Sequence, residues 1–146
     1  MRAVVQRVSL ASVAVDGEVV GSIGTGLLVL LGIGRGDEEG AGRWICDKLL
    51  KLRIFEDTEG RMNRNVVEAG GGILMVSQFT LYGYIGRGNR PGFDAAAPPE
   101  IAQVLYGKAV EYLRAVSPVP VATGVFGASM EVSLVNDGPV TLLLER

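Results

Sequence analysis

Val13-Ala14-Val15-Asp16-Gly17-Glu18-Val19-Val20 sets the β character of this chain. Asp-Gly between two apolar runs is typical of a type I′ turn, which needs positive φ at both central residues, so the stretch predicts a β-hairpin. Residues 2–8 read as a strand that leads into this hairpin. Residues 27–31 form a short apolar run between glycines, which indicates a buried strand.

Two helices are predicted further along the chain. Asp37 can cap the first, in which Ile45, Leu49 and Leu52 recur at helical spacing. Pro98-Pro99 opens the second helix, because proline is favoured in a first helical turn. The apolar face predicted for this second helix consists of Ile101, Leu105, Ala109, Tyr112, Leu113 and Val116.

The remaining elements indicate the fold class. Two helices among many short strands predict an α+β fold whose sheet is curved or closed into a barrel. A length of 146 residues fits one domain over residues 1–146. Later strands are expected at residues 72–79, 119–125, 130–135 and 140–144, with a turn at 136–139 between the last two.

The composition indicates a partner surface. Hydrophobic residues make up 48% of the chain and the mean hydropathy is +0.32. A small domain leaves much of its surface in water, so this apolar surplus predicts a second buried surface, most simply that of a homodimer. The net charge of −2 gives no bulk positive field for RNA, although the bias toward arginine over lysine favours bidentate phosphate contacts. A GC-rich genome would produce the same bias.

The chain shows no membrane or secretion pattern. Its longest apolar run, residues 27–31, is too short to span a bilayer, and no signal-peptide run follows Arg2. Cys46 is the only cysteine, which excludes an intrachain disulfide. We therefore expect a cytoplasmic protein in a reduced setting, with no membrane partner.

The sequence contains no histidine. This excludes Ser-His-Asp and Cys-His catalysis and every histidine-based metal site. No phosphate-binding loop or dinucleotide fingerprint is present, so we expect no cofactor and no metal, although a carboxylate-only Mg²⁺ site stays open. An enzyme of this composition needs a carboxylate with a raised pKa, a lysine with a lowered pKa, or help from its own substrate.

Two segments carry more polar chemistry than plain structure needs. Ser77-Gln78-Phe79-Thr80-Leu81 places hydrogen-bonding groups at the end of a buried strand, where sites are often held, although capping of backbone groups is the structural alternative. Asn136-Asp137-Gly138-Pro139-Val140-Thr141 is favourable turn chemistry. Its Gly-Pro bond can be cis at a cost of about 0.5–1 kcal/mol, and the sequence alone leaves the cis or trans state open.

These two segments, taken together and in this order, resemble the D-aminoacyl-tRNA deacylase family. Residues 1–8 are similar to the opening strand of that family, and residues 88–91 and 123–128 resemble its later landmarks. The resemblance implies a homodimeric hydrolase whose partner is aminoacyl-tRNA. Such an enzyme releases D-amino acids, and glycine mischarged on tRNA, while it spares L-aminoacyl-tRNA.

The resemblance also assigns residues to roles. Gly138 and Pro139 match a Gly-cisPro motif that reaches from one subunit into the pocket of the other and excludes L-amino acids sterically. Arg7 matches a position that holds this motif in place, and an exposed arginine at a strand end is its structural alternative. The remaining matches are Ser77, Gln78, Phe79 and Thr80 for the catalytic pocket floor, and Phe126 and Met130 for the adenosine pocket. Packing in the core is an equal alternative for Phe126 and Met130.

Thr80 is a poor candidate for the nucleophile. A threonine hydroxyl needs a base, the chain has no histidine, and the lysines Lys48, Lys51 and Lys108 lie far from Thr80 in the sequence. We expect a hydrogen-bonding role for Thr80 and oxyanion stabilisation by backbone N–H groups around Phe79. The resemblance implies that the 2′-hydroxyl of the terminal adenosine assists the attacking water.

The sequence departs from the family pattern in the loop at residues 83–92. Tyr84 stands where an acidic residue is common, and Gly92 stands where serine is usual. We expect these departures to affect tRNA affinity or the order of the loop more than the class of activity. Arg87 and Arg90 of this loop could contact acceptor-stem phosphates, and a solvated loop is an equal alternative.

Two other functions stay open at this point. The first is a non-catalytic RNA-binding module that kept the fold. The second is an enzyme of the same fold with relaxed chirality that acts on an L-aminoacyl-tRNA, which the intact Arg7 and Gly138-Pro139 disfavour.

Overall fold

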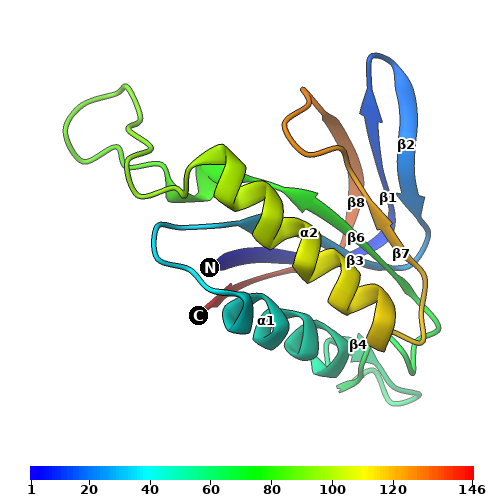
Figure 1. Cartoon of the computed structure of the whole chain (residues 1–146). Helices are drawn as coiled ribbons and strands as arrows, with labels where there is room; N and C mark the ends of the chain where they lie inside the picture. Colours follow the sequence, from blue (N-terminus) through cyan, green and yellow to red (C-terminus); the bar gives the residue numbers. More distant parts are fainter.

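The computed structural model describes residues 1–146. A six-stranded mixed sheet curves until it is nearly closed into a barrel, and two helices pack on one side of it (Figure 1), which confirms the α+β, barrel-like prediction. The strands are β1 (Arg2–Val15), β2 (Glu18–Ile23), β3 (Gly26–Gly32), β4 (Phe55–Glu56), β5 (Met62–Arg64), β6 (Gly72–Ser77), β7 (Val121–Thr123) and β8 (Glu131–Glu145); the helices are α1 (Glu39–Lys51), the 3-10 turn η1 (Phe79–Tyr82) and α2 (Pro99–Val116).

Strand β1 organises the sheet because it pairs with three others. One edge of β1 pairs antiparallel with β8, while its other edge pairs with β3 in the first half and with β2 in the second. Strands β3, β6 and β7 then run parallel to one another. The predicted hairpin is confirmed: it joins β1 to β2, with φ of 51° at Asp16 and 81° at Gly17. At the far side, a Cβ added to Gly21 of β2 would lie 2.5 Å from the Thr123 carbonyl of β7, so these strands nearly close the barrel.

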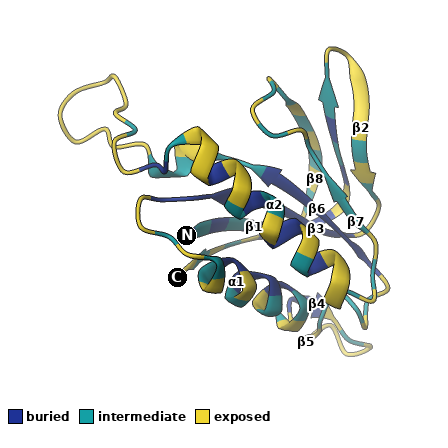
Figure 2. Cartoon of the chain, viewed as in Figure 1, coloured by how far each residue is buried: buried dark blue, intermediate teal, exposed yellow.

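Alternate residues of β3 and β6 enter two separate cores. Leu27, Val29 and Leu31 face the helices in the larger core, whereas Leu28 faces the smaller core inside the curved sheet. In β6, Met75 belongs to the first core and its neighbours to the second. A strand buried on both faces reads as a continuous apolar run, which is the pattern at residues 27–31 and 72–76. Figure 2 shows this burial along the central strands.

Helix α2 turns most of the predicted face to the core: Ala109 and Leu113 are buried, and Leu105 and Tyr112 pack against the core, but the two ends of that face are exposed. Ile101 and Val116 were expected to be buried, but they are 50% and 42% exposed. Ala102, which was not part of the predicted face, points inward together with the predicted Ala109, and a Cβ added to Gly42 of α1 would lie 3.4 Å from the Ala109 Cβ. Small side chains let the two helices approach closely, so the large side chain of Ile101 stays outside the interface. The buried residues of α2 are Ala102, Tyr106, Ala109, Val110 and Leu113.

Two local predictions about chain boundaries are wrong. Residues 136–139 do not form a turn between two strands, because β8 continues through them and pairs with β1 on both sides. Gln6 lies opposite Thr141 and Val8 opposite Asn136, so residues 137–140 bulge out of β8 opposite Arg7. The predicted strand at residues 72–79 ends earlier, at Ser77, and Phe79 begins the turn η1. Neither bulge nor turn has a sequence period that would reveal it.

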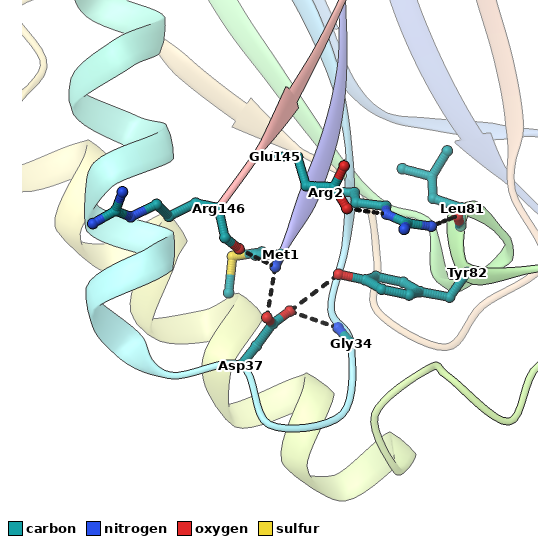
Figure 3. Close-up of polar contacts among 8 residues, drawn as sticks. All are labelled: Met1, Arg2, Gly34, Asp37, Leu81, Tyr82, Glu145 and Arg146. Carbon is teal, nitrogen blue, oxygen red and sulfur yellow. Dashed lines mark hydrogen bonds and ion pairs between the residues drawn. The ribbon is translucent and has the colours of Figure 1, made fainter.

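Asp37 does not cap α1. The N-cap position is Glu38, whose side chain makes no capping bond. The Asp37 carboxylate instead accepts hydrogen bonds from the Met1 ammonium at 2.6 Å, the Gly34 N–H at 2.6 Å and the Tyr82 hydroxyl at 3.3 Å (Figure 3). Burial, followed by the nearby Asp37 carboxylate, raises the pKa of the Tyr82 phenol to about 12, so this hydroxyl remains a donor. Asp37 thus ties the start of β1 to the end of η1.

Arg2 also holds Tyr82 and the end of η1 in place. Its guanidinium lies 4.7 Å from the ring centroid and donates to the Leu81 carbonyl at 3.2 Å and to the Glu145 carboxylate at 2.7 Å. Gly34 leaves room for the ring, because a Cβ there would lie 2.6 Å from it. The turn η1 is therefore held by β1, β8 and the segment after β3, which fixes the position of Phe79 at its start.

The thiol of Cys46 lies in the interface between the two helices. It is fully buried and its Sγ–H donates to the Ala109 carbonyl at 3.4 Å. Burial, and to a lesser extent Asp47, raises the pKa of the Cys46 thiol to about 12. Neither α1 nor α2 combines the length and the hydropathy that a membrane-spanning helix requires.

We predict that Asp37→Ala lowers the free energy of unfolding by about 2–4 kcal/mol, because the buried Met1 ammonium loses its counter-charge and keeps only the Arg146 carbonyl, and the Gly34 N–H loses its acceptor. Tyr82→Phe is the matched control and should cost below about 1 kcal/mol, since it removes only the long 3.3 Å bond and keeps the ring. Urea denaturation followed by circular dichroism measures both. An equal or smaller loss for Asp37→Ala would contradict the role of this carboxylate.

We also predict that the native protein reacts with DTNB at pH 8 at least about 100-fold more slowly than the unfolded chain. Only a thiolate attacks the reagent, and burial of Cys46 both disfavours the thiolate and blocks access of the reagent. One thiol per chain should react in guanidinium chloride. Rapid reaction of the folded protein would show that Cys46 is accessible.

Candidate active site

One large pocket opens where the parallel strands β3 and β6 end. It has a volume of about 810 Å³, within the usual range for a small-molecule site. Leu31 of β3 lies opposite Ser77 of β6 in the register, so the carboxyl ends of both strands meet at the pocket floor. The lining residues are Leu31, Ile33, Arg35, Val76, Ser77, Gln78, Phe79, Phe93, Ala96, Ala97, Pro98, Pro99, Ala102, Phe126, Gly127, Ala128, Met130 and Val132.

Three of the four residues predicted for the catalytic floor line this pocket. Ser77 and Gln78 are half-buried, and Phe79 leaves 57% of its surface exposed. The Phe79 ring packs edge-on against Phe93, with centroids 5.0 Å apart. Thr80 does not line the pocket, and its hydroxyl accepts a hydrogen bond from the Gln78 side-chain amide. Thr80 therefore touches the site through Gln78.

Phe126 and Met130, predicted from the resemblance, form part of another wall. The Phe126 ring lies 5.8 Å from the ring of Tyr106, whose hydroxyl donates to the Met75 carbonyl at 2.9 Å. Burial raises the pKa of the Tyr106 phenol to about 12, so this donor stays protonated. Gly124 leaves space for Met130, because a Cβ there would lie 2.6 Å from the Met130 sulfur. These contacts support Phe126 and Met130 on the side that faces away from the pocket.

Arg7 is buried, contrary to the structural alternative of an exposed strand-end arginine. Only 4% of the residue is exposed. Its Nη1 donates to the Ile54 carbonyl at 2.6 Å, and its Nε lies 3.2 Å from the Asp137 carbonyl and 3.0 Å from the Asp137 carboxylate. A Cβ added to Gly138 would lie 2.9 Å from Arg7 Nη2, and φ at Gly138 is +120°. Arg7 thus packs directly on the bulge in β8.

The Gly138–Pro139 peptide bond is cis, and both residues are exposed on the surface of the chain. No residue of 133–146 lines the pocket. The fold of one chain therefore brings Ser77, Gln78, Phe79, Phe126 and Met130 together, and places Arg7, Gly138 and Pro139 in a second group apart from them.

The pocket offers hydrogen bonds and apolar surface, and no proton-transfer group. Arg35 is its only titratable lining residue, and an arginine does not act as a base at neutral pH. No group of three or more His, Cys, Asp or Glu side chains in the structure could hold a metal ion. The arrangement is suited to binding a flat apolar group beside a few hydrogen-bonding atoms, and the lining residues supply no base.

The sequence did not reveal Arg35, Phe93, Ala96 and Ala97 as pocket residues, because they lie on irregular segments without a periodic signal.

The two positions that depart from the family pattern pair with each other: Tyr84 and Gly92 exchange backbone hydrogen bonds of 2.8 and 2.9 Å. This bridge closes the intervening loop, in which Arg87 and Arg90 are exposed and do not line the pocket.

Comparison with known proteins identifies relatives over the whole chain. Residues 4–145 match the family model described as D-Tyr-tRNA(Tyr) deacylase. D-aminoacyl-tRNA deacylases of Chlorobaculum parvum and Desulfitobacterium hafniense are each 61% identical over 145 residues, which cover 99% of this chain and 97% of each relative. That of Symbiobacterium thermophilum is 59% identical, with 99% of this chain and 95% of the relative covered.

Two solved structures share the fold. One, described as c-Myc DNA Unwinding Element Binding Protein, is 44% identical with a TM-score of 0.93 over 100% of this chain and 99% of its own. A probable eukaryotic D-amino acid tRNA deacylase is 21% identical with a TM-score of 0.78, over 98% and 97% of the two chains, which shows likeness of fold alone. The match over residues 4–145 and the 61% identities confirm the resemblance carried by residues 77–81 and 136–141: the chain belongs to the D-Tyr-tRNA(Tyr) deacylase family and is a D-aminoacyl-tRNA deacylase.

Proposed function

We propose that this deacylase proofreads chirality as a homodimer, in which Gly138-Pro139 of one subunit forms a wall of the other subunit's pocket. The wall would occupy the space that an L-amino acid needs and leave the D-amino acid unhindered. Selectivity then comes from exclusion, and each tenfold of discrimination needs about 1.4 kcal/mol.

The observation that carries this proposal is the position of Gly138-Pro139. The pair is exposed and held rigidly by Arg7, yet it lies outside the pocket of its own chain. A rigid main-chain projection with no function in its own subunit is explained if it enters another. Arg7 would then act as a positioning residue, because it bonds to Asp137 next to the motif.

A second copy of the chain would also cover surface that is costly to leave in water. Strand β8 pairs only with β1, so its outer edge carries unpaired backbone groups along a long strand. Leu10 of β1 and Val135 of β8 lie opposite each other and are 49% and 50% exposed, and Leu143 is 62% exposed. These features support the homodimer that the high mean hydropathy already favoured.

The pocket would bind the aminoacylated end of the tRNA. We assign Phe126 and Met130 to the terminal adenosine, and Ser77, Gln78 and Phe79 to the ester, with Thr80 orienting the Gln78 amide. Phe79 begins η1, so its N–H has no partner within that turn and can stabilise the oxyanion. Because the pocket holds no base, the 2′-hydroxyl of the adenosine would assist the attacking water.

Cleavage of glycine mischarged on tRNA follows from the same steric exclusion. It has no side chain, so a wall that rejects L-amino acids cannot reject glycine, and mischarged glycyl-tRNA becomes a second substrate. We place this activity in one domain over residues 1–146 and in the cytoplasm, where charged tRNA is used.

The test is single-turnover deacylation of matched D-Tyr-tRNA, L-Tyr-tRNA and Gly-tRNA by the purified protein. We expect D-Tyr-tRNA to be cleaved at least about 100-fold faster than L-Tyr-tRNA, which corresponds to about 2.8 kcal/mol. Gly-tRNA should be cleaved as well, and tRNA that lacks the terminal 2′-hydroxyl should be cleaved more slowly. Equal rates for the D and L forms would reject chiral exclusion, and binding without turnover would favour a non-catalytic module.

We predict that Thr80→Ala retains deacylation within about 10-fold of the wild-type rate, because the hydroxyl supports Gln78 and is not the attacking group. Gln78→Ala is the companion variant and should lose more, since that side chain lines the pocket. Complete loss of turnover in Thr80→Ala, with normal folding and normal tRNA binding, would identify Thr80 as the nucleophile.

A further inference from the structure

Arg35 lines the edge of the pocket and is hydrogen-bonded to the segment opposite it. It follows β3, and its backbone N–H donates to the Ala95 carbonyl at 2.9 Å. Its side-chain Nε donates to the Asp94 carbonyl at 2.5 Å. The guanidinium is therefore held by the segment that precedes α2, although the residue as a whole is exposed.

Arg35 is the only charged side chain that lines the pocket, and its charge is not neutralised within the chain. Arg35 forms no ion pair with a carboxylate, as is true of six other arginines of the chain, but it is the only one of these that lines the pocket. Its only side-chain hydrogen bond uses Nε, so both terminal nitrogens keep their N–H groups free. A guanidinium that is bonded at Nε, forms no ion pair and lies beside an apolar cavity is suited to an anionic part of a ligand.

We propose that Arg35 binds the phosphate that joins the terminal adenosine of the tRNA to the preceding nucleotide. This inference rests on the proposed binding of the aminoacyl-adenosine end in the pocket. An aminoacyl-adenosine carries no phosphate, so the first negative charge along the RNA is this linkage. With the adenosine in the pocket, the linkage leaves at the pocket edge, where Arg35 presents its two terminal nitrogens.

This assignment gives Arg35 a function different from that of the other polar pocket residues: it binds the RNA and takes no part in cleavage of the ester. Ser77, Gln78 and Phe79 would act on the ester and affect every substrate, whether or not it carries RNA. Arg35 would affect only substrates with a phosphate on the 5′ side of the adenosine. It would favour the long substrate by charge and leave the chemistry at the ester unchanged.

The experiment compares Arg35→Ala with the wild-type protein on D-Tyr-tRNA and on D-tyrosyl-adenosine, which has no phosphate. A charge-assisted contact is worth about 1.5–3 kcal/mol, so kcat/KM for D-Tyr-tRNA should fall about 10- to 150-fold, mainly through KM. For D-tyrosyl-adenosine the change should stay below about twofold. Arg35→Lys should recover part of the loss, because it restores the charge without the planar fork.

Salt dependence gives a second measurement on D-Tyr-tRNA alone. Loss of one contact to single-stranded phosphate should reduce the slope of log kcat/KM against log salt by about 0.7 in Arg35→Ala. The matched control is Arg61→Ala, an exposed arginine between β4 and β5 that does not line the pocket, and it should change neither value.

Three outcomes would overturn the inference: an unchanged kcat/KM for D-Tyr-tRNA, an equal loss on both substrates, or an unchanged salt slope. An equal loss would mean that Arg35 shapes the pocket and does not bind phosphate. Failure of the proposed function is distinguishable, because the wild-type protein would then show no preference for D-Tyr-tRNA over L-Tyr-tRNA.

Discussion

The buried guanidinium of Arg7 is the interaction on which the rest of this structure depends. It is the one charged side chain inside the core, and a buried charge is costly unless it is paired and hydrogen-bonded. The Ile54 carbonyl and Asp137 meet this requirement, and both are fixed relative to β1 as a result. The bulge of β8 therefore projects from the sheet in one defined position.

The same strand connects this projection to the pocket. Strand β1 carries Arg7 in its middle and Arg2 at its start, where Arg2 and Asp37 hold Tyr82 at the end of η1. Phe79 at the other end of η1 lines the pocket, so one strand positions both the pocket wall that contains Phe79 and the Gly138-Pro139 motif. The proposed function depends on such placement, because in a site without a base the hydrogen bonds aimed at the developing charge would do most of the catalysis.

The sequence was informative where a local rule dictates the structure. Asp16-Gly17 predicted the hairpin through its need for positive φ, and the strand predicted at residues 72–79 exists but ends at Ser77. Sequence was uninformative where long-range contacts decide. Asp37 looks like a helix cap, but the Met1 ammonium and Tyr82 compete for its carboxylate. Arg35 carries no local signal, since its importance arises from the approach of residues 94–95 to the end of β3.

The measurement that tests the role of Arg7 most directly is the ratio of kcat/KM for D-Tyr-tRNA and L-Tyr-tRNA in Arg7→Lys. Lysine keeps the charge but cannot reach the Ile54 carbonyl and Asp137 at once, so the bulge should lose its fixed position. We expect the D to L ratio to fall at least about 10-fold, through faster cleavage of L-Tyr-tRNA. A folded Arg7→Lys protein with the wild-type ratio would contradict this account.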